Sequence, residues 1–306
     1  MRAPVAVGYL LARASDTIAD TTVRSADERR AQLQTFVRLV EPGSAAGSTA
    51  AAQAPQAQAL ADSFAAAQEN EDERRLIMAM PQALQWLEAL PSADADDVRK
   101  VLHRITHGQM LDVERFASAT AASPHQLSSA TELHEYTYLV AGCVGEFWTR
   151  VAQRHDPHFA SLPLQQMMAL GRSYGQALQL VNILRDTEAD RAGGRCYLPA
   201  ESPLVAPWLT MAQAGLDDGM RYALALRGRR LRVASALPAM LGTRTLALLE
   251  AAGTSGHGLR VKVPRGQVRA LLWRTALSLG SARSLQWQYA GLRRETAAGE
   301  WDNRPQ

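Results

Sequence analysis

Apolar residues recur along most of this chain with the 3.6-residue period of an α-helix, and no window alternates with the period of two that marks a half-buried strand. In residues 3–22 the apolar positions share one helical face: Val7, Leu10, Leu11, Ala14 and Ile18. The same period predicts further helices at 71–90, 92–116, 128–154, 164–188, 207–228, 231–252 and 265–290. We therefore expect an all-α fold in which most helices bury one face.

Breaks in this pattern predict connecting segments and no domain boundary. Residues 41–58, EPGSAAGSTAAAQAPQAQ, are rich in Gly, Ala, Ser and Gln and predict a low-complexity loop. Gly193 and Gly194 end the helix that starts at 164, and GTSGHG at 253–258 predicts a flexible connector. Since no internal repeat is apparent beyond the two acidic motifs described below, we expect a single domain over residues 1–306.

Composition and charge support a helical protein and exclude one class of partner. Alanine and leucine, which lose little conformational freedom in a helix, are abundant among the 47% of residues that are hydrophobic. The formal net charge is only +3, and no block of five or more basic residues occurs. Such a distribution is not typical of a nucleic-acid-binding protein. The densest basic run, at 227–232, is interpreted as a solvated helix face or a phosphate-facing patch.

Cysteine usage and hydropathy indicate the compartment. Cys143 and Cys196 lie far apart and match no metal-ligand spacing, which favours a reducing environment without a disulfide framework. No stretch of 18 or more uncharged apolar residues is present, and the N-terminus lacks the layout of a signal peptide. We expect a cytoplasmic protein, with peripheral contact to the inner face of the membrane as the alternative.

The first candidate site lies on the helix at 3–22. Asp16 and Asp20 are four residues apart, so a helix places them on one face with about 5–6 Å between their Cβ atoms. Two like charges at this spacing destabilise a helix that is otherwise largely buried unless something positive lies close to them. One such pair alone is most often a solvated helix face.

The second candidate site repeats this arrangement near residue 186. Asn182, Asp186 and Asp190 stand at i, i+4 and i+8, so they form one polar stripe over two turns of an otherwise apolar helix. Each acidic pair is preceded by an arginine, Arg13 in the first motif and Arg185 in the second. Two solvated faces that coincide in this way are the weaker interpretation.

Carboxylate pairs of this kind suit magnesium chemistry. Magnesium takes oxygen ligands, often one or two carboxylates, several waters and phosphate oxygens of a substrate. Two facing pairs would hold such ions over a diphosphate and neutralise the leaving group as its carbon–oxygen bond breaks. The carbocation left behind needs a water-poor, apolar cavity, which helices rich in leucine and alanine would line.

Four ordered motifs resemble those of the squalene/phytoene synthase family. YLLARASDTIADT at 9–21 and GQALQLVNILRDTEADRAGGRCYLP at 175–199 are similar to its two aspartate-rich signatures. GQMLD at 108–112 resembles its GQxxD segment, and YTYLVAGCVG at 136–145 resembles its YxYxVAGxVG segment. The resemblance runs from about residue 2 to about residue 275, with gaps at the loops.

This resemblance implies a head-to-head prenyltransferase with the single-domain, all-α isoprenoid synthase fold, whose helices surround a central apolar cavity. It implies that five residues hold magnesium, with manganese as the alternative ion, and act on the diphosphates: Asp16, Asp20, Asn182, Asp186 and Asp190. Tyr136 would assist proton transfer or diphosphate departure. The residues implied to bind substrate are Arg13, Arg185 and Arg195 at the phosphates, and Val140, Ala141, Val144, Gly145 and Gln179 along the prenyl chain.

The residues of the two aspartate motifs, together with RTLALLE at 244–250, resemble those of bacterial squalene synthases more than those of phytoene synthases. The expected reaction is condensation of two farnesyl diphosphates through presqualene diphosphate to squalene, with NADPH as reductant. No GxGxxG loop marks a site for NADPH. The alternatives are phytoene from two geranylgeranyl diphosphates, and an enzyme whose product is dehydrosqualene or presqualene diphosphate.

The expected partners are isoprenoid diphosphates, with membrane contact for product release, no nucleic acid and no obligate protein partner. Family members also carry an N-terminal helix with a Ser-Arg-Ser/Thr-Phe motif. Because this chain begins Met1-Arg2-Ala3-Pro4, we expect that helix to be missing from the 306 residues. A non-catalytic relative that serves as an assembly or scaffold protein is the alternative from another class. Such a relative is expected to lose charges that no ion compensates, whereas all four aspartates are present here.

Overall fold

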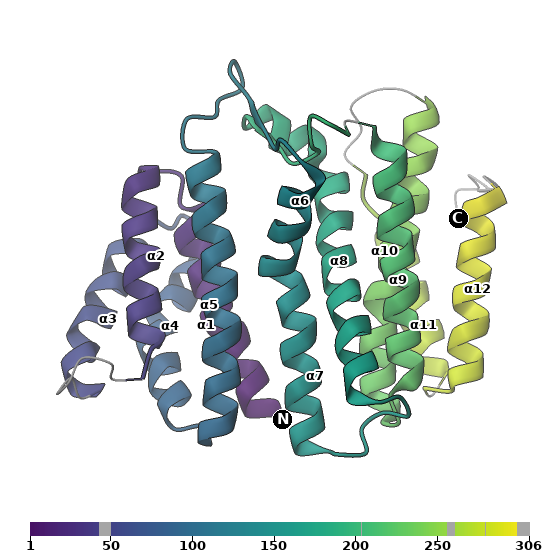
Figure 1. Ribbon diagram of the computed structural model, residues 1–306, viewed down its shortest axis with the longest axis horizontal. Helices are drawn as coiled ribbons and strands as arrows, with labels where there is room; N and C mark the ends of the chain where they lie inside the picture. The colour runs from purple at the N-terminus through teal and green to yellow at the C-terminus, as the bar shows by residue number, and fades with distance from the viewer. Residues whose placement is uncertain (43–49, 203, 256–260, 279, 299–306) are drawn as a thin grey trace. The chain divides into compact units, whose positions relative to one another are not determined.

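The structure, a computed structural model, describes residues 1–42, 50–202, 204–255, 261–278 and 280–298. These residues fold as helices joined by short connections, which confirms the all-α prediction (Figure 1). They divide into two compact units. Unit 1 holds residues 1–118 and 150–155, and unit 2 holds residues 119–149 and 156–306. The single-domain interpretation stays a prediction, and each unit is described by itself.

The described residues of unit 1 form five helices towards the N-terminal end of the chain, together with residues 150–155 of a later helix (Figure 1). They are α1 (Arg2–Asp20), α2 (Ala26–Val40), α3 (Ala50–Ala65), α4 (Glu71–Glu88) and α5 (Ser92–Arg115). Helix α1 contacts both α4 and α5. Four of its five predicted apolar positions, Val7, Leu11, Ala14 and Ile18, are buried. The amphipathic pattern therefore identified the inward face of α1 correctly.

Helix ends in unit 1 are set by local hydrogen bonds. Ser25 caps α2 in a capping box, in which its side chain accepts the Glu28 N–H and Glu28 accepts the Ser25 N–H. Asn70 caps α4 by accepting the N–H groups of Asp72 and Glu73. Because three acidic residues occupy the first turn of α4, its positive dipole end is matched as well.

A buried charge cluster connects residues 150–155 to α5 within unit 1. The Arg154 guanidinium forms ion pairs with Asp94, at 2.7 Å, and with Asp97. His155 Nε2 lies 2.9 Å from the second carboxylate oxygen of Asp94. Burial alone would raise the pKa of Asp94, but hydrogen bonds from Arg154 and His155 hold it below its ordinary value. The cluster therefore stabilises unit 1 by pairing two buried carboxylates with the partly exposed side chains of Arg154 and His155.

Unit 2 contains the remaining helices and one short parallel strand pair. The helices are α6 (Ala130–Thr137), the π-helix η1 (Tyr138–Gly142), α7 (Cys143–His155), α8 (Leu164–Ala192), α9 (Val205–Ala225), α10 (Arg229–Ser255), α11 (Arg265–Leu277) and α12 (Ala282–Ala298). The strands are β1 (His125–Gln126) and β2 (Arg195–Cys196), in the register His125 to Arg195. Residues 150–155, the last part of α7, belong to unit 1 because Arg154 and His155 contact the carboxylates of α5.

Glycines let the helices of unit 2 approach backbone to backbone. A Cβ atom on Gly145 of α7 would lie 1.9 Å from the Gly171 carbonyl oxygen of α8. One on Gly175 of α8 would lie 2.3 Å from the Ala141 carbonyl oxygen of η1. No side chain fits at either position, so these contacts hold α8 directly against η1 and α7.

Several predictions about the elements need correction. The connector predicted at 253–258 is one of them, because α10 runs to Ser255; residues 256–258 lie outside the described residues. The helix predicted at 265–290 is two helices, because Gly280 at φ +70° takes a left-handed conformation between them. Helix α3 starts at Ala50, inside the loop predicted at 41–58, since alanine favours helix strongly; residues 43–49 lie outside the described residues. Helix α2 was not predicted, although Ser25 and Glu28 carry the capping-box pattern.

No helix among the described residues is both long and apolar enough to span a bilayer.

Replacing Arg154 by alanine tests the charge cluster of unit 1. The change leaves two buried carboxylates without their main cation, so we expect the free energy of unfolding to fall by about 3 kcal/mol at pH 7. The lowered pKa of Asp94 means that this stability is present at neutral pH and is lost as the pH falls through the folded-state value. The loss should therefore shrink in acid. Urea unfolding at pH 7 and at about pH 2.5, which is below the ordinary pKa of an aspartate, measures both effects.

Arg75→Ala is the matched control, because the Arg75 side chain is 72% exposed and pairs only across one turn of α4. It should change the free energy of unfolding by less than about 0.5 kcal/mol. Equal losses in the two variants would contradict a stabilising role for the buried cluster.

Candidate active site

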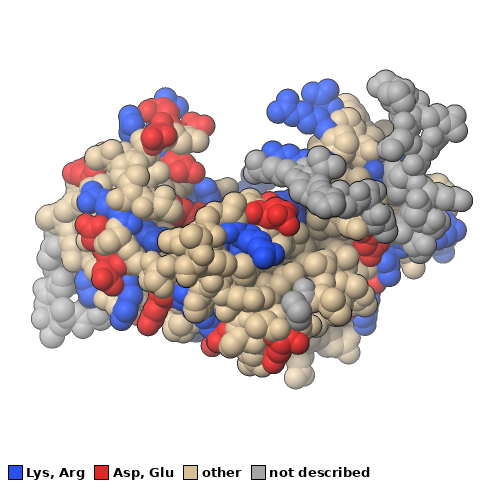
Figure 2. All heavy atoms as spheres, turned by 90° about the horizontal axis from the view of Figure 1, so that it is seen from above, with Lys and Arg blue, Asp and Glu red and all other residues tan. Residues whose placement is uncertain are grey.

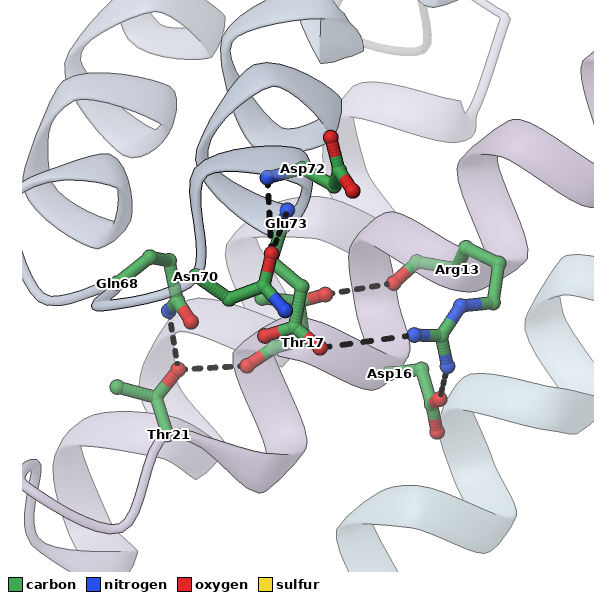
Figure 3. Close-up of polar contacts among 8 residues, drawn as sticks. All are labelled: Arg13, Asp16, Thr17, Thr21, Gln68, Asn70, Asp72 and Glu73. Atoms are coloured by element: carbon green, nitrogen blue, oxygen red, sulfur yellow. Dashed lines mark hydrogen bonds and ion pairs between the residues drawn. The ribbon is translucent and has the colours of Figure 1, made fainter.

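The first aspartate motif lies on α1 in unit 1. Arg13 forms an ion pair with Asp16 one turn along the helix, and its other terminal nitrogen lies 3.9 Å from Glu73 of α4. Figure 3 shows the Arg13 guanidinium between these two carboxylates. The N-terminus of α4 is held beside α1 by Gln68, whose side-chain amide donates to the Thr21 hydroxyl at 2.9 Å. Arg13 therefore lies within a fixed polar network.

Electrostatics set Asp16 apart from an ordinary surface carboxylate. Its pKa is raised to about 6, first by burial and then by the nearby charge of Asp20. Arg13 and a hydrogen bond with the Gln109 side chain oppose this shift. A further positive charge beside the carboxylates would remove the cost of ionising Asp16.

Gln109, on α5, supports a cation at this position. Its side chain is 8% exposed, and its Oε1 atom has no hydrogen-bond partner among the described residues. An amide oxygen without a donor, on a side chain that hydrogen-bonds the Asp16 carboxylate, is a hard oxygen ligand of the kind that magnesium takes. No group of three or more His, Cys, Asp or Glu residues that could hold a metal ion occurs in the described part of the chain. Water and phosphate oxygens would have to complete the coordination.

The second aspartate motif lies at the C-terminal end of α8 in unit 2. Arg185 pairs with the neighbouring Asp186 through two contacts, Nε to Oδ1 at 3.0 Å and Nη2 to Oδ2 at 2.5 Å. Arg195 on β2 contacts Asp190 at 3.2 Å. Asn182 is exposed one turn before Asp186. All three predicted polar residues of the stripe therefore lie on one helix, and two of them have an arginine beside them.

An apolar cavity of about 470 Å³ lies in the same unit, against the same helix. Its lining residues come from η1, α7, α8, α9 and α10: Val140, Ala141, Val144, Gly145, Trp148, Gly171, Tyr174, Gly175, Leu178, Tyr222, Ala234, Ser235 and Pro238. The structure thus brings together four residues that the sequence motif had singled out, Val140, Ala141, Val144 and Gly145. Gln179 is half-buried beside Leu178 and is not among the lining residues.

The cavity and the polar stripe share one face of α8. Gly171, Gly175 and Leu178 line the cavity. Asn182 and Asp186 follow Gly175 by 7 and 11 residues, a spacing that returns to the same side of a helix. An elongated apolar ligand in the cavity would therefore have carboxylates and arginines along the continuation of its wall.

Tyr136 lies on α6 in unit 2 and is half-buried. Its ring stacks on Tyr197, with 5.2 Å between centroids and 21° between planes. Tyr197 follows directly after β2, which carries Arg195. The stacking ties Tyr136 to the segment that reaches Asp190.

The chain matches the family model described as squalene/phytoene synthase over residues 1–203. It belongs to the squalene/phytoene synthase family. Curated relatives include a probable squalene synthase of Neurospora crassa, 26% identical over 64% of this chain. They also include a bifunctional lycopene cyclase/phytoene synthase of Podospora anserina, 31% identical over 39% of the chain, and a 15-cis-phytoene synthase of Paracoccus sp., 35% identical over 34% of it. These alignments span 36%, 20% and 29% of the relatives' own lengths, respectively.

A solved structure, TcSQS in complex with the ligand BPH1237, superposes on 99% of this chain and 85% of its own with a TM-score of 0.72. Its sequence is 18% identical, so this likeness shows the fold alone. The all-α fold predicted for this member of the squalene/phytoene synthase family is thereby confirmed.

Sequence reasoning missed several residues that the structure places at these sites. Tyr174 and Tyr222 line the cavity, and burial raises the pKa of both, for Tyr222 to about 12, so both stay neutral. Their hydroxyls are engaged: Tyr174 donates to the Ser235 carbonyl at 2.8 Å, and Tyr222 lies 3.0 Å from the Thr149 hydroxyl. In sequence, both lie among apolar helix positions, so nothing distinguishes them from core residues.

A second missed group follows the YxYxVAGxVG segment directly. Glu146, which is 2% exposed, pairs with Arg172 of α8 at 2.5 Å. The Arg172 guanidinium also lies over the Tyr138 ring, 5.6 Å from its centroid. The Gly-Glu dipeptide at 145–146 is the signal that could have found this group, because a glutamate within an apolar helix requires a partner.

The free energy of unfolding of Asp16→Asn tests whether the ionised Asp16 carboxylate destabilises the fold. The raised pKa means that protonated Asp16 adds stability below about pH 4, and that this stability is lost as the pH rises through about 6. Without metal, the variant should therefore be more stable than the wild type at pH 8, by on the order of 1 kcal/mol after allowing for solvent screening. At pH 4 the two should be nearly equal. Urea unfolding in the presence of a chelator measures the difference.

Asp72→Asn is the control, since that side chain is 92% exposed. It should show no gain at pH 8. Added magnesium should raise the stability of the wild type and not that of Asp16→Asn. If the wild type were as stable as Asp16→Asn at pH 8 without metal, ionised Asp16 would not destabilise the fold, and this would contradict the prediction.

Proposed function

We propose that this chain is a prenyltransferase that joins two isoprenoid diphosphates head to head, with magnesium bound at its aspartate motifs. The observation that carries the proposal is the shared face of α8, on which an apolar cavity continues into a stripe of Asn182, Asp186 and neighbouring arginines. A prenyl diphosphate has this same division into an apolar chain and a highly charged end.

The residues of the second motif have separable tasks in this proposal. Asp186 and Asp190 are each held by an arginine, so their carboxylates keep a defined orientation before substrate arrives. Arg185 and Arg195 also provide positive charge for phosphate oxygens. Magnesium, when bound at Asp16, Asp20, Asn182, Asp186 and Asp190, would neutralise the diphosphate as it leaves.

The cavity contributes in two ways: it excludes water, and aromatic side chains line it. A carbocation formed at the end of a prenyl chain is rapidly captured by water, so the site that holds it has to be apolar. Trp148, Tyr174 and Tyr222 line the cavity, and an aromatic ring attracts a cation that lies over its face within about 6 Å. The phenols are neutral and hydrogen-bonded, so they do not supply a nucleophilic oxyanion.

Within the family, we propose farnesyl diphosphate as substrate and squalene as product, formed through presqualene diphosphate with NADPH as added reductant. The alignment with the probable squalene synthase of Neurospora crassa, which spans more of this chain than those with the two phytoene synthases above, supports this choice. The higher identity of the phytoene synthases favours geranylgeranyl diphosphate and phytoene as the second candidate. No residue is assigned to NADPH.

Product analysis tests the proposal. The purified chain is incubated with magnesium and either farnesyl or geranylgeranyl diphosphate, with and without NADPH, and the products are identified by mass spectrometry. Squalene that forms only with NADPH supports the first candidate, and phytoene from geranylgeranyl diphosphate supports the second. No pyrophosphate release from either substrate would contradict an enzyme and favour the scaffold alternative.

Asp16→Asn and Asp186→Asn should each lower turnover at least about 100-fold while the far-UV circular dichroism stays unchanged, because each removes a carboxylate that binds metal. Glu188→Gln is the matched control, since Glu188 is exposed on α8 away from the face of Asn182 and Asp186. It should stay within about twofold of the wild type. Near-wild-type rates for either aspartate variant at matched magnesium would sink the assignment.

Tyr136→Phe should reduce kcat about 10- to 100-fold and leave KM nearly unchanged, because the ring keeps its stacking on Tyr197 and only the hydroxyl is lost. Tyr9→Phe, at a side chain that is 65% exposed, provides the control and should have no effect. An increase in KM with normal kcat would show that Tyr136 binds the substrate and takes no part in the chemistry.

A further inference from the structure

Charge is distributed very unevenly along this chain. Residues 251–294 contain eight basic residues and no aspartate or glutamate. The whole chain has 33 Lys and Arg against 30 Asp and Glu, so the rest of it holds 25 basic against 30 acidic residues. Over α1–α5, by contrast, basic and acidic side chains alternate, as the left part of Figure 2 shows. The excess positive charge of the protein therefore resides in one segment of unit 2.

Helix α11 in this segment presents apolar side chains outward. Leu271 and Thr275 are buried on its inner face, on the helix that contacts α10. On the opposite face, Trp273 is 69% exposed and Leu277 is 73% exposed. Arg269 precedes them on the same face by one and two turns, at i−4 and i−8.

Helix α12 repeats this combination. Trp287 is 66% exposed and lies on one face with Arg283 and Arg294, at i−4 and i+7. A groove of about 260 Å³ lies between α11 and α12. Its lining is Leu271, Arg274, Trp287, Gln288, Gly291, Leu292 and Arg294. The outer residues of the two helices, Arg269, Trp273, Arg274, Leu277, Arg283, Trp287 and Arg294, are called the α11–α12 surface below.

Exposed tryptophan and leucine side chains beside four arginines match one kind of partner. A soluble surface gains nothing from two exposed tryptophans, and such a patch marks an interaction site. Tryptophan favours the boundary between water and hydrocarbon, leucine favours the hydrocarbon itself, and arginine pairs with phosphate. A bilayer with anionic phospholipids offers all three environments in one plane.

Other occupants account for less of this surface. A second copy of the chain meeting the same face would bring arginines against arginines, which opposes association. Single-stranded nucleic acid would stack on the tryptophans, but it provides no apolar phase for Leu277. Charge complementarity therefore selects an anionic, partly apolar surface.

We propose that the α11–α12 surface docks this chain peripherally on anionic lipid bilayers. Trp273, Leu277 and Trp287 enter the boundary of the acyl region, and Arg269, Arg274, Arg283 and Arg294 contact lipid phosphates. Docking of this kind is reversible and weakens with salt, because the arginine contacts are exposed and are screened. It is independent of substrate, so its failure and a failure of the proposed prenyltransferase activity are distinguishable.

Vesicle co-sedimentation tests the proposal without substrate. The full chain is mixed with vesicles of phosphatidylcholine alone, or with about one quarter phosphatidylglycerol, at low and high salt. We expect at least about tenfold tighter binding to the anionic vesicles, and loss of most of that binding in high salt. Equal binding to both kinds of vesicle, or none to either, would overturn it.

Two sets of variants locate the contact. Trp273→Ser combined with Leu277→Ser, and Arg269→Gln combined with Arg274→Gln and Arg294→Gln, should each weaken binding to anionic vesicles about tenfold or more. The matched controls are Trp86→Ser and Arg75→Gln on α4, where Trp86 is 46% exposed. These controls should bind as the wild type does, and circular dichroism checks the fold of every variant. Equal losses in controls and test variants would overturn the assignment to this surface.

Tryptophan fluorescence supplies a direct readout. Vesicles should shift the emission of the wild type to shorter wavelength, and Trp273→Phe combined with Trp287→Phe should abolish the shift while the Phe side chains preserve part of the binding. A shift that persists in this double variant would place the contact elsewhere. Light scattering covers the case in which vesicle binding is absent: a dimer that Trp273→Ser disrupts would show that this surface binds a second copy of the chain and would overturn lipid docking.

Discussion

The backbone contact of α8 with η1 and α7 is the constraint on which the rest of unit 2 depends. Gly145 and Gly175 allow carbonyl groups of the facing helix to approach where any Cβ atom would clash. The same close approach fixes the rotation of α8 about its axis, and Gly145, Gly171 and Gly175 also line the cavity. Because Asn182 and Asp186 follow Gly175 at helical spacing, this rotation also decides where the polar stripe lies.

Charge imposes the second constraint, and arginine meets it at most positions. Asp186 and Asp190 each have an arginine in contact, and Glu146 has Arg172. Asp16 has Arg13, yet its pKa is still raised, so one arginine does not compensate for burial and for Asp20 together. A folded protein keeps such a residual cost where a ligand relieves it, and the oxygen of Gln109 that lacks a donor lies at the same place.

Much of this arrangement was predictable because it follows from helical spacing. The buried face of α1 and the polar stripe of α8 both follow from i, i+4 patterns, and Val140, Ala141, Val144 and Gly145 were placed at a cavity by their motif. What escaped prediction depends on contacts between elements that are distant in sequence. Gln109 approaches Asp16 from α5, and Tyr174 finds its acceptor on α10. The break between α11 and α12 at Gly280 was not predicted either, because a single glycine inside an apolar pattern does not by itself indicate a left-handed conformation.

The two constraints together decide which residues are able to tune the cavity. A larger side chain at Gly145, Gly171 or Gly175 would separate the helices, because the atoms in the way are backbone. It would also displace the polar stripe that follows on α8, so such a substitution would lower catalytic activity as well as stability. The lining residues Trp148, Tyr222 and Ser235 are not glycines at such a backbone contact, so the restriction does not apply to them. Differences in the length of the bound chain between relatives of this fold are therefore to be sought at such positions, where the cavity volume changes without moving the polar groups.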